Sequence, residues 1–249
     1  MRAPNSRPVD APRTDDAFGE MVWDYYHDAL AERPQYRRDD GQVSEAHLEV
    51  YFSDPTGWPE EYRRQLATLD GPVLDVGCGP GKNALAFQTR GVDVFAIDRS
   101  PGAIAVAREQ GVENAAVMDI RDVTILEDTF RSTIVVGKQL AVGDSIPDLR
   151  ATLDALATAV RPGGHLLADF NTPARCPASY LDDRWLDDDG VAYRRFRVEY
   201  DDLVGPWVDI LLLEPAALNE IARATAWEID KIVGPAPGES DYRVSFERN

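Results

Sequence analysis

Three glycines follow a short apolar segment in the stretch VLDVGCGPG, which ends at Gly81. Residues 72–76 before them have the apolar character of a buried strand. A turn built from glycine has almost no side chains, so a ligand can approach its backbone N–H groups closely. Asp75, just ahead of the turn, suits a ligand that carries an ammonium group. The stretch therefore predicts a ligand-binding turn at the end of a strand.

The glycine spacing differs from that of dinucleotide-binding turns. Those turns follow G-x-G-x-x-G, in which the third glycine lets the helix pack beside the pyrophosphate. Gly77 and Gly79 fit this pattern, but Lys82 stands at the position of the third glycine. The difference counts against a nicotinamide-dependent oxidoreductase, which remains an alternative enzyme class.

Two further acids end predicted strands. Asp98 lies 21 residues after Gly77, where a carboxylate can accept hydrogen bonds from both ribose hydroxyls. Asp119 ends the next strand, where it can accept from an adenine amino group while Met118 and Ile120 hold the ring. Together with Asp75, three acids are expected along one sheet edge, and their combination predicts a nucleoside ligand.

Strands and helices alternate through the middle of the chain, which is typical of a doubly wound, mostly parallel α/β sheet. Ser100 is the expected N-cap of one of these helices, with Pro101 at its first position. The strands are expected at 72–76, 93–98, 114–119, 130–137 and 165–170, and the helices at 81–90, from 100 and at 147–160.

The two ends of the chain depart from this alternation. Residues 1–14 are expected to be a disordered leader, and residues 15–69 an N-terminal helical cap that opens with a helix over 15–32. The remaining domain, 70–249, is expected to contain a β-hairpin insertion at about 171–214. Its arms are 191–200 and 207–214, and a helix over 215–226 and a strand pair, 227–233 and 242–248, close the chain.

These features resemble the class I methyltransferases that use S-adenosylmethionine. The resemblance covers about residues 70–171 and rests on VLDVGCGPGKNA, VFAIDRSPGAI, VMDI and RPGGHLLADF. It implies a Rossmann-like, seven-stranded sheet whose last strand is antiparallel. The stretch upstream of this domain, YRRDDG…VYF…GWP in residues 36–59, is similar to that of a bacterial and archaeal subgroup of the family. Arg131 departs from the family pattern, in which an acid usually follows the phenylalanine, and is expected to alter packing more than chemistry.

The resemblance also assigns the cofactor contacts. The Gly77–Gly81 turn would contact the methionine part of S-adenosylmethionine, Asp98 the ribose and Asp119 the adenine. The full set of expected cofactor-binding residues is Asp75, Gly77, Cys78, Gly79, Gly81, Asp98, Arg99, Met118, Asp119, Ile120 and Gly137.

Methyl transfer from a sulfonium is an in-line displacement, to which a protein contributes mainly by alignment and exclusion of water. A general base would help if the acceptor is a hydroxyl or a protonated amine. The weak catalytic candidates are His27, Tyr26, Lys138 and Gln139. His47 and His165 are further histidines, for which surface and packing roles are the plainer interpretation. No metal-binding motif is expected to take part.

Several features bear on the acceptor. The strand end GKQL lacks the Asn/Asp-Pro-Pro-aromatic sequence of methyltransferases that act on nucleobase amino groups. Arg37 or Arg38 could reach a cofactor carboxylate. An aromatic set could enclose a small apolar or cationic acceptor or serve as a hydrophobic cap: Trp23, Tyr25, Tyr26, Tyr51 and Trp58. The expectation is a small-molecule acceptor; an RNA or protein methyltransferase and a non-catalytic binding module remain alternatives.

The charge composition is unusual. The chain of 249 residues carries 44 acids against 26 Lys and Arg, a net charge of −18, and only three of the bases are lysines. This composition predicts a halophilic protein adapted to concentrated salt, which screens repulsion between carboxylates. The absence of a basic stripe argues against nucleic acid. With two cysteines and no long apolar run, a cytoplasmic protein without membrane association is expected.

Overall fold

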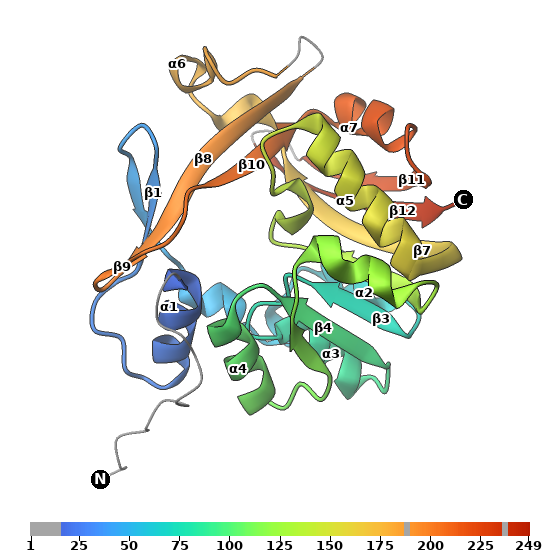
Figure 1. Cartoon of the computed structure of the whole chain (residues 1–249), viewed down its shortest axis with the longest axis horizontal. Helices are drawn as coiled ribbons and strands as arrows, with labels where there is room; N and C mark the ends of the chain where they lie inside the picture. Colours follow the sequence, from blue (N-terminus) through green and yellow to red (C-terminus); the bar gives the residue numbers. More distant parts are fainter. Residues whose placement is uncertain (1–15, 187–189, 236–238) are drawn as a thin grey trace.

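The computed structural model describes residues 16–186, 190–235 and 239–249, and the predicted leader lies outside them. These residues form two sheets (Figure 1). A large sheet occupies one side of the molecule, and the long strand β8 (Val191–Tyr200) arches away from it with β10 (Val208–Leu213).

The large sheet has seven strands among the described residues, in the order β11-β12-β7-β6-β3-β4-β5. Five neighbouring strands are parallel, and β12 runs antiparallel between β11 and β7. This confirms the predicted Rossmann-like sheet with its last strand antiparallel. The strands are β3 (Val73–Val76), β4 (Val94–Asp98), β5 (Ala115–Val117), β6 (Phe130–Val135), β7 (Val160–Asn171), β11 (Trp227–Val233) and β12 (Asp241–Arg248).

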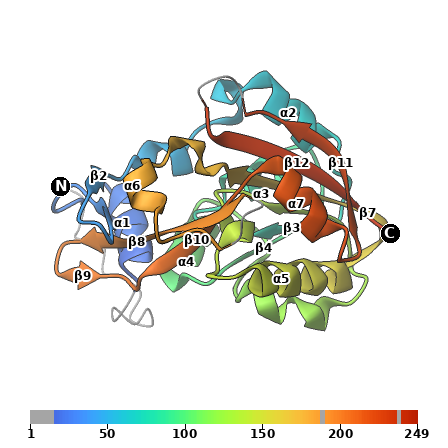
Figure 2. The ribbon, with the colours of Figure 1, turned by 90° about the horizontal axis from the view of Figure 1, so that it is seen from above.

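Helices cover both faces of this sheet, and Figure 2 shows α2 and α5 on opposite sides of it. One buried cluster joins a first group of helices to one face, and a second cluster joins the other group to the opposite face. The first group is α2 (Glu60–Ala67), α3 (Lys82–Thr89) and α4 (Pro101–Glu109); the second is α5 (Ile146–Ala159) and α7 (Pro215–Ala222).

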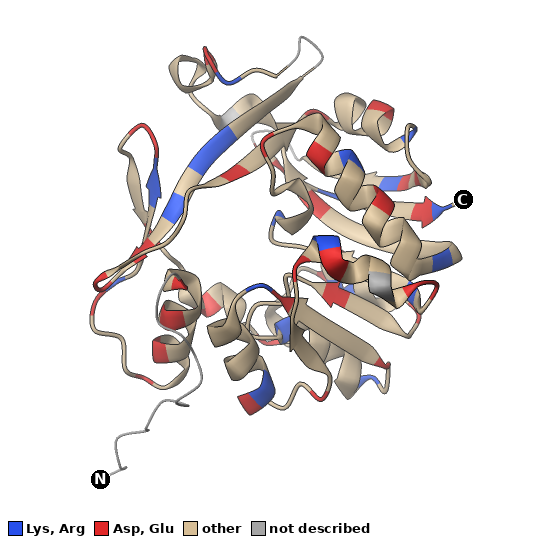
Figure 3. Cartoon of the chain, in the orientation of Figure 1, with Lys and Arg blue, Asp and Glu red and all other residues tan. Residues whose placement is uncertain are grey.

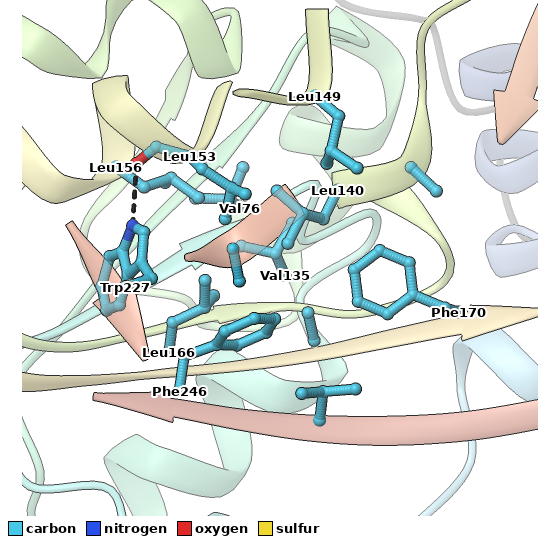
Figure 4. Close-up of a cluster of buried hydrophobic side chains, with 14 of the residues drawn as sticks. Val76, Val135, Leu140, Leu149, Leu153, Leu156, Leu166, Phe170, Trp227 and Phe246 are labelled. Carbon is cyan, nitrogen blue, oxygen red and sulfur yellow. Dashed lines mark hydrogen bonds between the residues drawn. The ribbon is translucent and has the colours of Figure 1, made fainter. Parts of the chain in front are cut away.

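The larger core cluster lies between the sheet and α5 (Figure 4). Leu149, Leu153 and Leu156 of α5 are buried against it. Trp227, at the start of β11, is 1% exposed and donates its indole N–H to the carbonyl of Leu153 at 2.8 Å. This core fixes the strand ends that carry the candidate site.

The second sheet has the order β10-β8-β1-β2, with β9 (Leu203–Val204) also paired to β8. The hairpin of β8 and β10 agrees with the predicted insertion. The strands β1 (Gln35–Arg38) and β2 (Val43–Glu45) were not predicted, since their stretch was assigned to a helical cap. The reason is that QYRR has no apolar alternation, and β1 is paired along its length with β8, which lies far away in the sequence.

The N-terminal helix is also shorter than predicted. α1 spans Ala17–Tyr26 rather than 15–32. The ring Nδ1 of His27 lies 2.9 Å from the carbonyl of Trp23, and Asp28 follows with φ at +55°. This left-handed residue ends the helix, because a right-handed helix cannot continue through it.

The remaining elements are short. They are α6 (Ala178–Leu181) and the 3₁₀ turns η1 (Leu48–Tyr51), η2 (Pro55–Gly57), η3 (Ile120–Leu126), η4 (Gln139–Ala141) and η5 (Pro173–Arg175). Among the residues described, no helix is both long and apolar enough to span a bilayer.

Candidate active site

The glycine turn follows β3 directly. Its backbone is left-handed, with φ at +65° for Gly77, +55° for Gly79 and +92° for Gly81. A Cβ at Gly81 would lie 2.6 Å from a side chain of the α4–β5 connection, so glycine is needed there for close packing. At Gly79 the nearest atoms to such a Cβ are ring carbons of Phe18 and Tyr51, each at 3.9 Å. The turn therefore leaves room against its backbone beneath two aromatic rings.

Asp75 lies under this turn and is 1% exposed. Its carboxylate accepts from the backbone N–H of Ala84, whereas Oδ2 is buried and has no hydrogen-bond partner among the described residues. Burial raises the pKa of Asp75 to about 7, with a further contribution from the nearby Asp98 carboxylate. An unsatisfied buried carboxylate oxygen is costly, so this atom is suited to a cationic donor.

Asp98 ends β4 and is also buried. Its Oδ2 accepts from the backbone N–H of Gly79 at 2.9 Å, and its Oδ1 accepts from that of Ser100 at 2.8 Å. Burial raises the pKa of Asp98, and these two N–H donors partly oppose the rise. Each oxygen retains a further acceptor site, so the carboxylate can both hold the glycine turn and bind a diol.

Asp119 follows β5 and is more exposed than the other two acids. It accepts from the backbone N–H of Arg121 at 2.9 Å and from its guanidinium at 3.1 Å. The hydrogen bond from Arg121 lowers the pKa of Asp119, so the group is ionised at neutral pH. Met118 and Ile120 on either side are partly buried against the main core. The three acids thus end adjacent strands β3, β4 and β5.

Arg99 follows Asp98 and is exposed. It lines a cavity of about 220 Å³ between the large sheet and the second sheet. The other lining residues are Val142, Gly143, Asp144, Asp148, Trp207, Val208 and Asp209. The arched hairpin therefore forms one wall of the space beside the predicted nucleoside contacts.

Helix α1 is fixed beside these residues by Asp16. One carboxylate oxygen accepts from the N–H of Gly19 at 2.8 Å, and the other accepts from Ser100 Oγ at 2.7 Å and from the N–H of Gly102 at 3.0 Å. A Cβ at Gly102 would lie 2.7 Å from the Cα of Gly19, so the helices α1 and α4 touch through glycine. Asp16 thus caps both helices at once.

The cover over the glycine turn continues from α1 into η1. Tyr51 contacts Phe18 edge to face, with ring centroids 5.4 Å apart. Its hydroxyl lies 2.8 Å from that of Tyr36 on β1. Burial raises the pKa of Tyr51 well above its ordinary value. Lys82, which replaces the third glycine of dinucleotide-binding turns, donates to the carbonyl of Val50 at 2.7 Å and so connects α3 to this cover.

His27 and Tyr26 lie away from the glycine turn. One ring nitrogen of His27 is bonded to α1, and the other lies 2.9 Å from a carboxylate oxygen of Glu109 on α4. Both nitrogens are engaged in the α1–α4 contact, which leaves none for an acceptor. Tyr26 is 37% exposed and packs against the rings of His27 and Phe52.

Lys138 and Gln139 follow β6 at the same sheet edge, as predicted. The Lys138 ammonium donates to Asp169 at 2.7 Å and lies 3.5 Å from Asp241, so it is paired within the protein. Gln139 packs directly on the turn, since a Cβ at Gly77 would lie 2.4 Å from its Cγ. Gly137 has φ at +80°, with no atom within 4 Å of the place of a Cβ.

The remaining residues that the sequence singled out lie at the following places in the structure. Cys78 is buried; its N–H donates to the carbonyl of Ile97 at 3.0 Å, and its thiol donates to the carbonyl of Gly79 at 3.4 Å. His47 is exposed beside Glu49. The rest are placed as follows: His165 on β7 opposite Ser132 and Glu247, Arg131 exposed on β6, Arg37 paired with Glu199, and Arg38 paired with Asp40.

The structure divides the predicted aromatic set. Trp23, Tyr25 and Tyr51 join one hydrophobic cluster, in which Phe18 and Tyr36 also take part. Trp58 belongs to another cluster, with its ring centroid 5.7 Å from the Lys82 ammonium. Tyr36 was not predicted from the sequence as part of this cluster, because nothing in the polar stretch around it indicated a strand.

Known proteins that are similar to this chain are methyltransferases. Residues 73–164 match the methyltransferase domain family. A ubiquinone biosynthesis O-methyltransferase of Alkalilimnicola ehrlichii is 36% identical over 119 residues, which cover 47% of each chain. Its counterpart in Azotobacter vinelandii is 35% identical over 126 residues, 50% of this chain and 52% of that one. The chain thus spans about half the length of the curated relatives it matches.

A solved structure covers much more of the chain. It is a SAM-dependent methyltransferase from Bacteroides fragilis in complex with S-adenosyl-L-homocysteine, with a TM-score of 0.78 and 25% identity over 95% of this chain and 96% of that one. The likeness therefore extends well beyond the residues 73–164 that match the family. The fold and these likenesses show that the chain contains a class I, S-adenosylmethionine-dependent methyltransferase domain.

Proposed function

We propose that this protein transfers a methyl group from S-adenosylmethionine to a small-molecule acceptor by in-line displacement. The observation that carries the proposal is the pair of buried acids at the glycine turn. Asp98 keeps acceptor capacity while it holds the N–H of Gly79, and Asp75 has an oxygen with no partner among the described residues. A ribose diol and an ammonium group match these two sites.

The residues present fit the cofactor. Asp75 would bind its ammonium group, Asp98 its ribose and Asp119 its adenine, while Gly79 and Gly137 leave backbone open for close approach. Arg99 and the hairpin would enclose the nucleoside from the side. When bound, the cofactor supplies an activated methyl group on its sulfonium.

The protein would contribute alignment and exclusion of water. Phe18 and Tyr51 cover the glycine turn, and Asp16 fixes the helix that carries Phe18. Methyl displacement requires a near-linear approach of the acceptor, which a rigid cover and turn enforce. Removal of water strengthens the electrostatic contacts inside the site. No obligatory base is needed in this scheme.

A small-molecule acceptor is supported by two observations. The curated relatives are named as O-methyltransferases of ubiquinone biosynthesis, and the chain has a net charge of −18, which disfavours nucleic acid. An RNA or protein acceptor is the alternative, and a salt-dependent shift of nucleic acid on a native gel would favour the RNA alternative.

The test is calorimetric binding of S-adenosylhomocysteine and, separately, NADH, in 2 M KCl and in low salt. We expect S-adenosylhomocysteine to bind and Asp98→Asn to weaken it roughly 100-fold, because two charge-assisted hydrogen bonds are lost. Asp93→Asn, an exposed change at the opposite end of β4, is the matched control. Binding of NADH alone, or of neither ligand, would refute the proposal.

A further inference from the structure

The arginines around the second sheet are nearly all paired with acids, and Figure 3 marks the positions of basic residues along β8 in blue. The pairs are Arg37 with Glu199, Arg38 with Asp40, Arg184 with Asp39, Arg195 with Asp209 and Arg197 with Glu199. Arg194 differs. No carboxylate of a described residue pairs with it, and its Nε is buried without a hydrogen-bond partner.

That Arg194 has no carboxylate partner among the described residues is notable in a chain with 44 acids and 26 bases. A buried guanidinium N–H that makes no hydrogen bond has lost its hydration without compensation. Such a group gains most from a ligand that accepts from it. A planar guanidinium fork matches a carboxylate in particular.

The position of Arg194 on β8 decides what it faces. Side chains alternate along a strand, so Arg194 shares a face with Phe196 and Val198. Val198 is the register partner of Tyr36, whose hydroxyl contacts that of Tyr51 beside the glycine turn. This face of the second sheet therefore turns toward the predicted methyl donor.

An aromatic lining connects the two ends of this face. The rings of Tyr36 and Phe196 meet edge to face, with centroids 5.7 Å apart. The Arg194 guanidinium lies over the Phe196 ring at 5.8 Å. Arg194 and Val198 are four positions apart on the strand, roughly 13 Å, so this face is long enough to hold a small molecule with a polar group at each end.

We propose that Arg194 binds the carboxylate of the methyl acceptor, while the Tyr36–Tyr51 hydroxyl pair faces the acceptor end that receives the methyl group. The inference rests on the proposed methyltransferase function. It names the substrate class as carboxylate-bearing small molecules, and it makes Arg194 a specificity-determining residue. Arg197, on the opposite face of β8 and paired with Glu199, has no such role.

The experiment titrates benzoate and, in parallel, its neutral isostere benzamide into the protein saturated with S-adenosylhomocysteine, observed by ligand NMR. Wild type, Arg194→Gln and the matched control Arg197→Gln are compared. We expect benzoate to bind wild type and Arg197→Gln similarly, to bind Arg194→Gln roughly tenfold or more weakly, and to bind better than benzamide.

The outcomes separate this inference from the proposed function. Equal binding of benzoate and benzamide to wild type, or no binding of benzoate while S-adenosylhomocysteine still binds, overturns the role of Arg194. Unchanged benzoate affinity in Arg194→Gln does the same. Failure of wild type to bind S-adenosylhomocysteine refutes the proposed function itself. If Arg194→Gln does not fold, the benzoate–benzamide comparison on wild type decides.

Discussion

Asp75 combines a structural cost with the binding role that we propose for it. Burial raises its pKa to about 7, above its ordinary value of 3.8, so the folded protein holds this proton more tightly than the unfolded chain. Its contribution to stability therefore declines as the pH rises from about 4 to about 7 and changes little above that. The same carboxylate must be ionised to bind an ammonium group. A group with this conflict is typical of a functional site.

Replacement by asparagine should separate the two effects. The midpoint of thermal unfolding of wild type should fall between pH 5 and pH 8. We expect a smaller fall in Asp75→Asn, by about 2–4 °C for each kcal/mol of burial penalty that the substitution removes. Differential scanning calorimetry without cofactor measures this. A decline equal to that of wild type would contradict the assigned pKa.

Cofactor binding should depend on pH in the opposite direction from stability. S-adenosylhomocysteine affinity of wild type should fall as the pH drops below about 7, because Asp75 takes up a proton. Asp75→Asn should bind roughly tenfold more weakly at pH 8 and show less of this dependence. Calorimetric titrations at pH 6 and pH 8 compare the two proteins, and parallel pH profiles would count against an ammonium contact.

At the scale of elements, the α1–α4 contact holds Phe18 over the glycine turn. It depends on Asp16, which binds the ends of both helices. We expect Asp16→Ala to cost about 1 kcal/mol of stability through the lost cap. It should also increase amide exchange in α1 and weaken S-adenosylhomocysteine binding severalfold, because Phe18 is no longer held in place.

Hydrogen exchange followed by mass spectrometry checks the loss of protection in α1. Asp16→Asn, which keeps an acceptor oxygen at the cap, should behave more like wild type. Unchanged exchange in α1 together with unchanged affinity would show that Asp16 does not control the cover.

The contact of β11 with α5 belongs to the fold rather than to the site. Trp227 fills the core and donates to Leu153 (Figure 4). Trp227→Phe should lower the free energy of unfolding by about 1–2 kcal/mol and leave S-adenosylhomocysteine affinity unchanged. Chemical denaturation measures the loss. Trp207 is 43% exposed, so Trp207→Phe is the control and should change stability little. A larger loss of stability in Trp207→Phe than in Trp227→Phe would contradict the structural role of Trp227.

For the whole molecule, the net charge of −18 predicts dependence on salt. Repulsion among carboxylates is screened as the Debye length falls from about 10 Å at 0.1 M to about 3 Å at 1 M. We expect the midpoint of thermal unfolding to rise between 0.1 and 1 M KCl and to change less above 1 M. Scans across that range test this, and a constant or falling midpoint would remove the basis for salt adaptation.

Much of the central domain could be predicted because its elements are specified by short sequence patterns. The apolar strand before Gly77, the cap at Ser100 and the acids at strand ends all depend on residues close in sequence. Parallel strands joined by right-handed crossovers then bring Asp75, Asp98 and Asp119 to one edge, so spacing along the chain is enough to predict their proximity.

The second sheet could not be predicted in the same way. β1 becomes a strand through its pairing with β8, whose residues lie about 160 positions later in the chain. The Tyr36–Tyr51 contact follows from that pairing, and Arg194 lies on the same strand β8, opposite Ile210 of β10. The roles of His27 and Lys138 could not be predicted for the same reason. Their partners Glu109 and Asp169 are distant in sequence, and these contacts engage the nitrogen atoms that were expected to contact an acceptor.

The sequence by itself determined the methyltransferase domain, its glycine turn and its row of acids, because hydrophobic periodicity and turn chemistry act over a few residues. Only the tertiary structure decided which side chains line the proposed acceptor site. That surface is built from strands of two distant segments, and whether a charged side chain there is paired or open depends on the position of every neighbour it meets after folding.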